Sequence, residues 1–107
     1  MDLRVLRSFI TICKLGNITR ASEALFISQP ALTRQLQELE EEVGTKLLNR
    51  STRNLTLTES GYLFLHRAEE ILALANQAKR ELSEKRRFFA RNSSDRSGRN
   101  FGHGFSH

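Results

Sequence analysis

Residues 28–40 read SQPALTRQLQELE, and this stretch decides the fold. Ser28 is of the residue type that accepts a hydrogen bond from a free backbone N–H at the start of a helix. Pro30 falls in the first turn, where its missing N–H costs nothing. Apolar residues then recur at i, i+4, i+7 and i+11, so they form one stripe of an amphipathic helix. The stripe consists of Leu32, Leu36, Leu39 and Val43.

The opposite side of this predicted helix is polar and, over its first half, free of acids. Residues 24–37 contain no Asp or Glu, whereas acids crowd residues 38–42. At about 100° per residue, the side chains that point away from the stripe are those of Pro30, Thr33, Arg34 and Gln37. A helix that holds Gln, Thr and Arg forward and keeps its acids back suits a nucleic-acid groove.

Size and charge set limits on the rest of the chain. Its 107 residues leave room for one small domain and an appendage. Residues 85–107 carry six basic side chains against a single Asp95, which equals the whole net charge of +5. The first 84 residues are therefore balanced. A case for DNA must rest on where charges lie in that part, not on their total.

Several function classes receive no support from the sequence. The single cysteine, Cys13, has no partner for an intramolecular disulfide and no neighbouring metal ligands, so we expect a small buried hydrophobe. No carboxylate pair or metal spacing surrounds His66, His103 or His107, so neither an enzyme nor a metal site nor a cofactor is predicted. No apolar run is long enough to span a membrane, and the start is not a signal peptide. The expected location is the cytoplasm.

Two shorter helices are predicted before residue 28. The first covers residues 2–15 and stops at Gly16. Thr19 is the predicted N-cap of the second, whose small apolar face allows another helix to approach closely. That face is formed by Ala21, Ala24 and Leu25. Two short helices joined by the tight link Phe26-Ile27 outline a helix-turn-helix.

A two-stranded hairpin and a long helix complete the predicted fold. Residues 46–50 and the alternating LTLT of residues 55–58 read as strands around a polar turn, with Arg50 and Arg53 near the tip. Thr58 or Ser60 then starts a helix to about Lys85. Its apolar positions have an average spacing of 3.5, as in a coiled coil. This seam consists of Phe64, Ala68, Ile71, Ala75, Ala78 and Leu82. We expect it to pair two chains; the alternative is packing on its own domain.

The fold class is therefore mainly α: a helix-turn-helix with a small hairpin, followed by a long dimerisation (linker) helix and a disordered tail. The expected boundaries are residues 1–58 for the DNA-binding domain, 59–87 for the linker helix and 88–107 for the basic Ser/Gly/Asn-rich tail. The tail has few aliphatic residues and buries too little surface to offset the cost of ordering.

The segment from Phe9 to Gly61 resembles the DNA-binding domain of the LysR-type transcriptional regulators. The matching pieces, in order, are ASEAL (21–25), SQPALTRQL (28–36), LEEEVG (39–44), KLLNR (46–50) and LTESG (57–61). Thr33 and Leu48 stand where Ser and Phe are frequent. The resemblance implies a winged helix-turn-helix and a linker helix that pairs two chains. Members continue into a large effector-binding domain, which we expect this chain to lack, along with its small-molecule site.

The expected function is that of a sequence-specific DNA-binding transcriptional regulator, truncated and acting on double-stranded DNA as a homodimer at an inverted-repeat operator. By resemblance, the first residues of the 28–40 helix read the major groove, where Gln suits adenine and Arg suits guanine or a phosphate. The predicted DNA-contacting residues are Ser28, Gln29, Pro30, Ala31, Thr33, Arg34, Gln37, Arg50, Arg53 and Arg20.

Other interpretations remain open at this point. Gln29, Thr33 and Arg34 would otherwise form an ordinary solvated face, and Arg50 and Arg53 simple surface charge. The alternative function is an interaction module that heterodimerises with a full-length relative and interferes with it. A further alternative is a truncated remnant with an unrelated tail.

Overall fold

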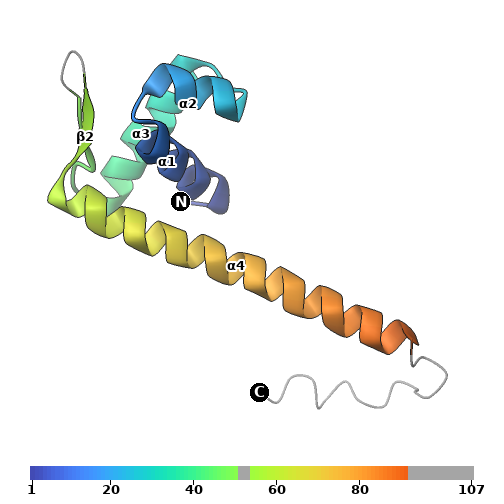
Figure 1. Ribbon diagram of the computed structural model, residues 1–107. Helices are drawn as coiled ribbons and strands as arrows, with labels where there is room; N and C mark the ends of the chain where they lie inside the picture. Colours follow the sequence, from blue (N-terminus) through green and yellow to red (C-terminus); the bar gives the residue numbers. More distant parts are fainter. Residues whose placement is uncertain (51–53, 92–107) are drawn as a thin grey trace. The chain divides into compact units, whose positions relative to one another are not determined.

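The computed structural model describes residues 1–50 and 54–91. In this part of the chain, helices α1 (Leu3–Leu15), α2 (Ile18–Leu25) and α3 (Gln29–Val43) precede strands β1 (Leu48–Arg50) and β2 (Leu55–Leu57) and helix α4 (Glu59–Arg91). The contacts divide the chain into two compact units: the first comprises Met1–Leu74, and the second begins at Ala75. The predicted fold class, a winged helix-turn-helix with a following long helix, is confirmed (Figure 1).

The caps of α1 and α2 follow from local chemistry. The Asp2 carboxylate accepts from the Val5 N–H at the start of α1. Gly16 ends that helix with φ at +65°, a conformation that costs glycine little. Asn17 then caps α2, its Oδ1 accepting from the Arg20 N–H at 2.8 Å. The prediction of Thr19 as N-cap is wrong, because Asn17 is already extended and able to cap one residue after the glycine.

The core of the first unit is built on the predicted stripe of α3. Leu32, Leu36 and Leu39 are buried, and Val43 is half-buried against them. From α2, Ala21 is completely buried but Ala24 is exposed, so the close face of α2 is narrower than predicted and includes Ser22. The remaining large buried side chains of this core are Phe9, Ile12, Leu47 and Leu48.

The wing is an antiparallel hairpin in which Leu48 pairs with Leu57 and Arg50 with Leu55. The Glu40 carboxylate attaches it to the end of α3, with Oε2 accepting from the N–H groups of Leu47 at 2.7 Å and Leu48 at 3.1 Å. These charge-assisted bonds fix the first strand relative to the helix.

Thr58 joins the second strand to α4. Its hydroxyl donates to the Lys46 carbonyl at 2.7 Å and accepts from the Gly61 N–H at 2.9 Å. Its own N–H donates to the Leu47 carbonyl. Of the two predicted starts of the long helix, Thr58 and Ser60, Thr58 is the one that precedes its first residue, Glu59. The same residue holds the hairpin to the helix.

Helix α4 is longer than predicted, since it continues to Arg91. Residues 88–91 (FFAR), assigned to the tail from composition, are helical because the good helix formers of residues 84–87 (EKRR) lead into them and Ala90 and Arg91 also favour a helix. The predicted disordered tail from residue 92 onward lies outside the described residues. No helix of the described part is long and apolar enough to cross a membrane.

The start of the predicted seam belongs to the core of the first unit. Ala68 is completely buried and packs with Leu6 and Ile10 of α1. The Phe64 ring meets Phe9 edge to face at a centroid distance of 5.3 Å. Assigning Ala68 to a surface between two chains is therefore corrected, because its own chain already covers it. Phe64 is half-buried and contacts α1, so its place on a surface between two chains stays a prediction.

Candidate nucleic-acid interface

The N-terminal end of α3 presents an open polar surface. The Ser28 hydroxyl accepts from the Ala31 N–H at 3.2 Å, and Pro30 lies in the first turn. The Ser28 cap and Pro30 define the first turn of the helix, and the side chains of Gln29 and Ala31 take no part in this. Thr33 is half-buried. The predicted contact residues of this helix that are exposed are Ser28, Gln29, Pro30, Ala31, Arg34 and Gln37.

The charges around this surface are arranged to favour an anion. Among the described residues, the Arg34 guanidinium forms no ion pair, and α3 has no acid in its first turn. The acids of α3 lie in its second half, where Glu40 turns to the wing and Glu42 pairs with the N-terminal ammonium at 2.8 Å. The positive end of the helix dipole lies at the N-terminus of α3, so it adds to the attraction of the Arg34 guanidinium for an anion there.

The turn that leads into this surface is strained. Phe26 has φ of +60° and ψ of +40°, the left-handed region, which costs a residue with a Cβ about 1–2 kcal/mol. Its N–H donates to the Glu23 carbonyl, and the Ile27 N–H donates to the Ser22 carbonyl at 3.1 Å. These bonds close α2 two residues before the cap of α3. The sharp turn sets the direction in which α3 begins.

The basic residues outside α3 are placed less completely. Arg50 is exposed at the end of β1, where the wing leaves the core. Arg53 lies outside the described residues. Arg20 is exposed on the first turn of α2, where its backbone N–H donates to Asn17 Oδ1. The structure thus brings Ser28 to Arg34 together on one helix end, with Arg50 on the wing.

Two residues that position the interface were not predicted. Glu40 was counted only as one of several distal acids, and Thr58 only as a helix start. The contacts of Glu40 join residues seven and eight positions apart, and the hydroxyl of Thr58 reaches back twelve positions. Neither leaves a periodic signal. The matches LEEEVG and LTESG contain both residues, which is the one sign of their importance that the sequence carries.

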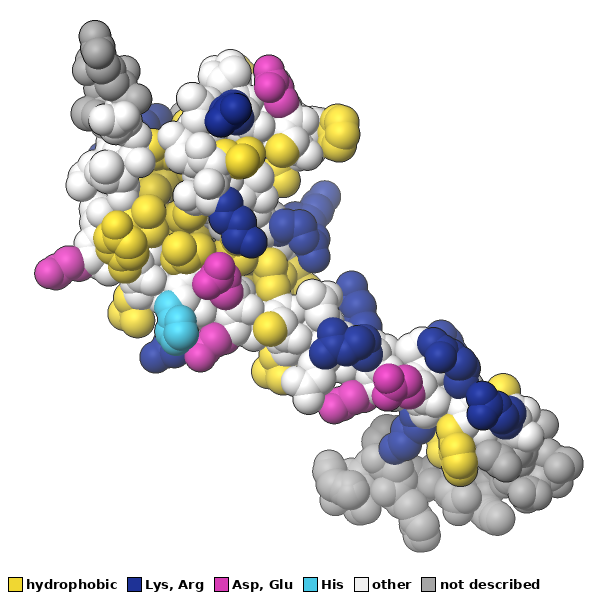
Figure 2. Space-filling view, viewed as in Figure 1, with side chains coloured by type: hydrophobic (Ala, Val, Ile, Leu, Met, Phe, Trp, Pro, Cys, Tyr) yellow, Lys and Arg dark blue, Asp and Glu magenta, His cyan; other side chains and the backbone are white. Residues whose placement is uncertain are grey.

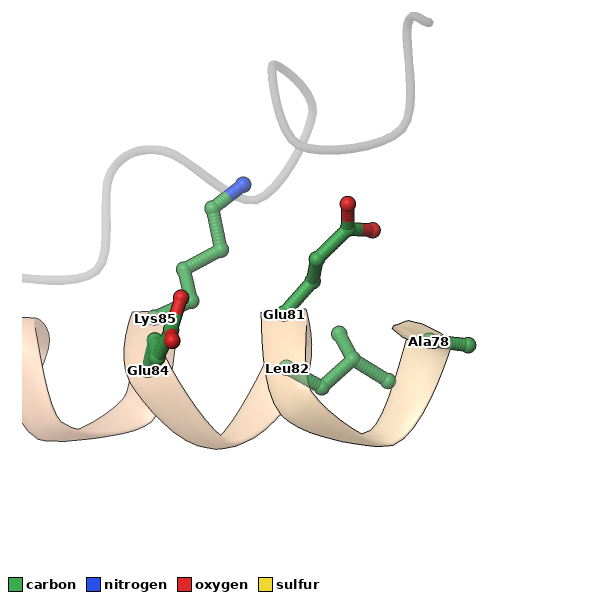
Figure 3. Close-up of a pocket in the computed structure, with 5 residues that line it drawn as sticks. All are labelled: Ala78, Glu81, Leu82, Glu84 and Lys85. Carbon is green, nitrogen blue, oxygen red and sulfur yellow. The ribbon is translucent and has the colours of Figure 1, made fainter. Parts of the chain in front are cut away.

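The exposed part of α4 carries charges of both signs. Figure 2 shows acidic and basic side chains along this helix. Figure 3 shows the five residues that line a pocket, all of them from α4. They are Ala78, Glu81, Leu82, Glu84 and Lys85. All five are exposed, and Glu81 also accepts from Gln77 at 3.0 Å, so the pocket offers no buried polar group to a small ligand.

The described residues give no support to catalysis or metal binding. They contain no cluster of three or more potential metal ligands. His66 is exposed, with its Nε2 at 3.4 Å from a Glu70 oxygen one helical turn away. Cys13 is half-buried, and burial raises the pKa of its thiol to about 12, so it is neutral and unreactive at physiological pH.

The comparisons with known proteins agree with this geometry. A family model for bacterial regulatory helix-turn-helix proteins of the lysR family matches residues 3–62. The HTH-type transcriptional regulator BudR of Klebsiella aerogenes is 50% identical over 78 residues, 73% of this chain and 54% of that protein. BudR of Raoultella terrigena has the same identity over 27% of its own length. The chain thus spans between about a quarter and a half of these relatives.

Solved structures match over a similar extent. The DNA-binding domain of CbnR, in a complex with DNA, has a TM-score of 0.77 and 40% identity, covering 79% of this chain and 98% of that one. The BenM domain, in a complex with the catB site 1 DNA, has a TM-score of 0.72 and 38% identity, covering 82% and 96%. The chain therefore belongs to the lysR family of bacterial regulatory helix-turn-helix proteins.

Proposed function

We propose that this chain is a sequence-specific, double-stranded-DNA-binding transcriptional regulator of the cytoplasm, with the first half of α3 in the major groove. The observation that carries the proposal is the exposed, acid-free end of α3 with an unpaired Arg34 among the described residues. The similar domains of CbnR and BenM, solved with DNA, support it. No catalytic step is part of the proposed function.

The roles within α3 follow from donor and acceptor chemistry. Gln29 has the donor and acceptor to pair with adenine N6 and N7, and Arg34 has the fork to pair with guanine O6 and N7. Thr33 offers a methyl to thymine or a hydroxyl to a phosphate. Pro30 and Ala31 are small enough for the backbone to come close. Ser28 and Gln37 border this group at its two ends.

The basic residues outside α3 are assigned to the DNA backbone. We place Arg50 and Arg53 of the wing on phosphates or in a narrow minor groove, and Arg20 on a phosphate. Contacts of this kind orient a protein on the duplex and add affinity that falls with salt, without reading sequence. Arg50→Ala should therefore weaken binding on all sequences and reduce the salt slope.

Two copies are proposed to pair through α4. Ile71 is 41% exposed and Leu82 is 68% exposed on the predicted seam, with Ala78 also exposed and Ala75 half-buried. Because alanines permit close approach, a second α4 can cover these positions. A two-fold dimer would present two α3 helices to inverted half-sites one or more helical turns apart.

Selection of bound fragments from random duplexes by the full chain tests the proposal. We expect a recurrent inverted repeat. Arg34→Ala should then cost about 1–3 kcal/mol at the selected site and much less on unrelated duplexes. Recovery of fragments with no common sequence would contradict specific recognition, and an equal loss on every duplex would reduce Arg34 to a phosphate contact.

A second candidate is interference with a longer relative. The exposed seam on α4 and 50% identity over 78 residues to BudR favour it, because a face that accepts its own copy also accepts a close relative of that copy. Mixed dimers on co-expression, with reduced operator binding by the relative, would support this candidate. Exclusive homodimers would remove it.

A further inference from the structure

Phe26 is the residue of this fold whose conformation and exposure both lack a folding explanation. Among the described residues it is the one non-glycine residue with a positive φ. Its side chain is also 92% exposed, the highest value among the exposed large hydrophobic residues of that part. Strained backbone positions persist where the rest of the structure imposes them, and they cluster at functional sites.

The fold needs the turn but not the phenyl ring. A helix end of this kind is served best by glycine or asparagine, which adopt positive φ at little cost. The apolar contact that usually accompanies such an end comes from the next residue, since Ile27 is half-buried and packs on the core. The ring of Phe26 therefore contributes neither to the turn nor to the core.

Phe26 lies in the turn between α2 and α3, next to the proposed interface. It stands two residues before the Ser28 cap and three before Gln29, and its backbone bonds to Glu23 hold it in place. A duplex that accommodates the first turn of α3 passes close to this residue. Apolar groups on a duplex at that place are the C5-methyl of thymine in the major groove and the deoxyribose of the backbone.

We propose that Phe26 is a DNA-contacting residue that packs its ring on an apolar group of the duplex beside the bases read by α3. The inference rests on the proposed function and adds a contact from outside the recognition helix. The ring loses water-exposed apolar surface when DNA binds, and this burial favours the complex.

The test compares Phe26→Asn with the unchanged full chain. Asparagine accepts the left-handed turn, so the variant should fold more stably, with a melting temperature higher by about 4–8 °C. It lacks the ring, so affinity for the selected duplex should fall by about tenfold. This is the loss expected if DNA binding buries about half of the apolar surface of the phenyl ring. A matched control is Phe89→Asn, which removes a 55% exposed ring from α4 and should leave DNA affinity unchanged.

Substitution of deoxyuridine for thymidine in the selected duplex distinguishes the two apolar groups that the ring could contact, the thymine methyl and the deoxyribose. If the ring packs on a methyl, one substitution weakens the wild-type chain and has no effect on Phe26→Asn. If it packs on deoxyribose, each substitution affects the wild-type chain and Phe26→Asn equally, and the variant loses affinity equally on selected and scrambled duplexes. Both results support the contact.

Three results would overturn it. If Phe26→Asn binds the selected duplex as tightly as the wild-type chain, the proposed contact is wrong, and the proposed function is unaffected. A lower melting temperature would mean that the ring serves folding. Failure of the wild-type chain to bind any selected duplex would remove the proposed function, and this contact with it.

Discussion

At the residue scale, the contact that leaves least room for a larger side chain joins the first turn of α4 to Leu47, just before β1. Gly61 is buried in the first turn of α4, and a Cβ there would collide with the carbonyl oxygen of Leu47. That carbonyl also accepts from the Thr58 N–H, so it cannot move away without loss. Glycine is required here for close backbone approach, not for an unusual φ.

Gly61→Ala should therefore destabilise the fold by about 1–3 kcal/mol, because the wing and α4 must separate. Urea unfolding followed by circular dichroism measures the change. Ser60→Ala, in the same turn, is the control and should have little effect. Equal stabilities of Gly61→Ala and wild type would contradict the close approach.

Asp2 links stability to pH. The Val5 N–H donates to its carboxylate, and this bond lowers the pKa of Asp2 below its ordinary value. Because the folded pKa is the lower one, the contribution to stability is present above the unfolded pKa and is lost as pH falls through the folded pKa. Asp2→Asn keeps the cap but does not titrate. The acid side of its stability profile, below about pH 4, should be flatter than that of wild type.

At the element scale, the wing depends on one carboxylate of α3. Glu40→Ala would leave the N–H groups of Leu47 and Leu48 without their acceptor, at a cost of about 1–3 kcal/mol. Thermal unfolding measures this loss. Glu41→Ala, an exposed neighbour, is the matched control and should be neutral. If both variants unfold at the wild-type temperature, Glu40 does not hold the wing.

The elements differ in how well the sequence predicts them. The start and the buried side of α3 were predicted correctly because the capping residue, the proline and the apolar period agree. The cap of α2 was placed two residues late, since Asn17 and Thr19 both suit the position. The end of α4 was underestimated because its last residues lack the aliphatic side chains that mark a helix face.

The candidate interface was predictable only in part. Helical period predicts the exposure of Pro30, Arg34 and Gln37 and the burial of Leu32 and Leu36. It does not predict that Thr33, on the same polar side, is half-buried. The positive φ of Phe26 left no trace, because residues that favour this conformation are Gly, Asn and Asp. Whether an apolar residue of α4 meets its own core or a second chain depends on distant partners, which explains Ala68.

At the scale of the whole molecule, the exposed seam of α4 predicts a dimer. The full chain should sediment at twice its mass at micromolar concentration. Leu82→Glu places a charge on a side chain that is 68% exposed, so it should give a monomer with unchanged helix content. A wild-type chain that sediments as a monomer would contradict pairing through α4.

The central claim is that the first half of α3 reads the major groove, and the most direct measurement is atomic substitution in the selected duplex. Replacing single purines by 7-deaza analogues removes the N7 acceptor and leaves base pairing intact. We predict a loss of about 1–3 kcal/mol at one or two purines, with no further loss at the matching purine in Gln29→Ala or Arg34→Ala. Undiminished affinity at every substituted purine would contradict the claim.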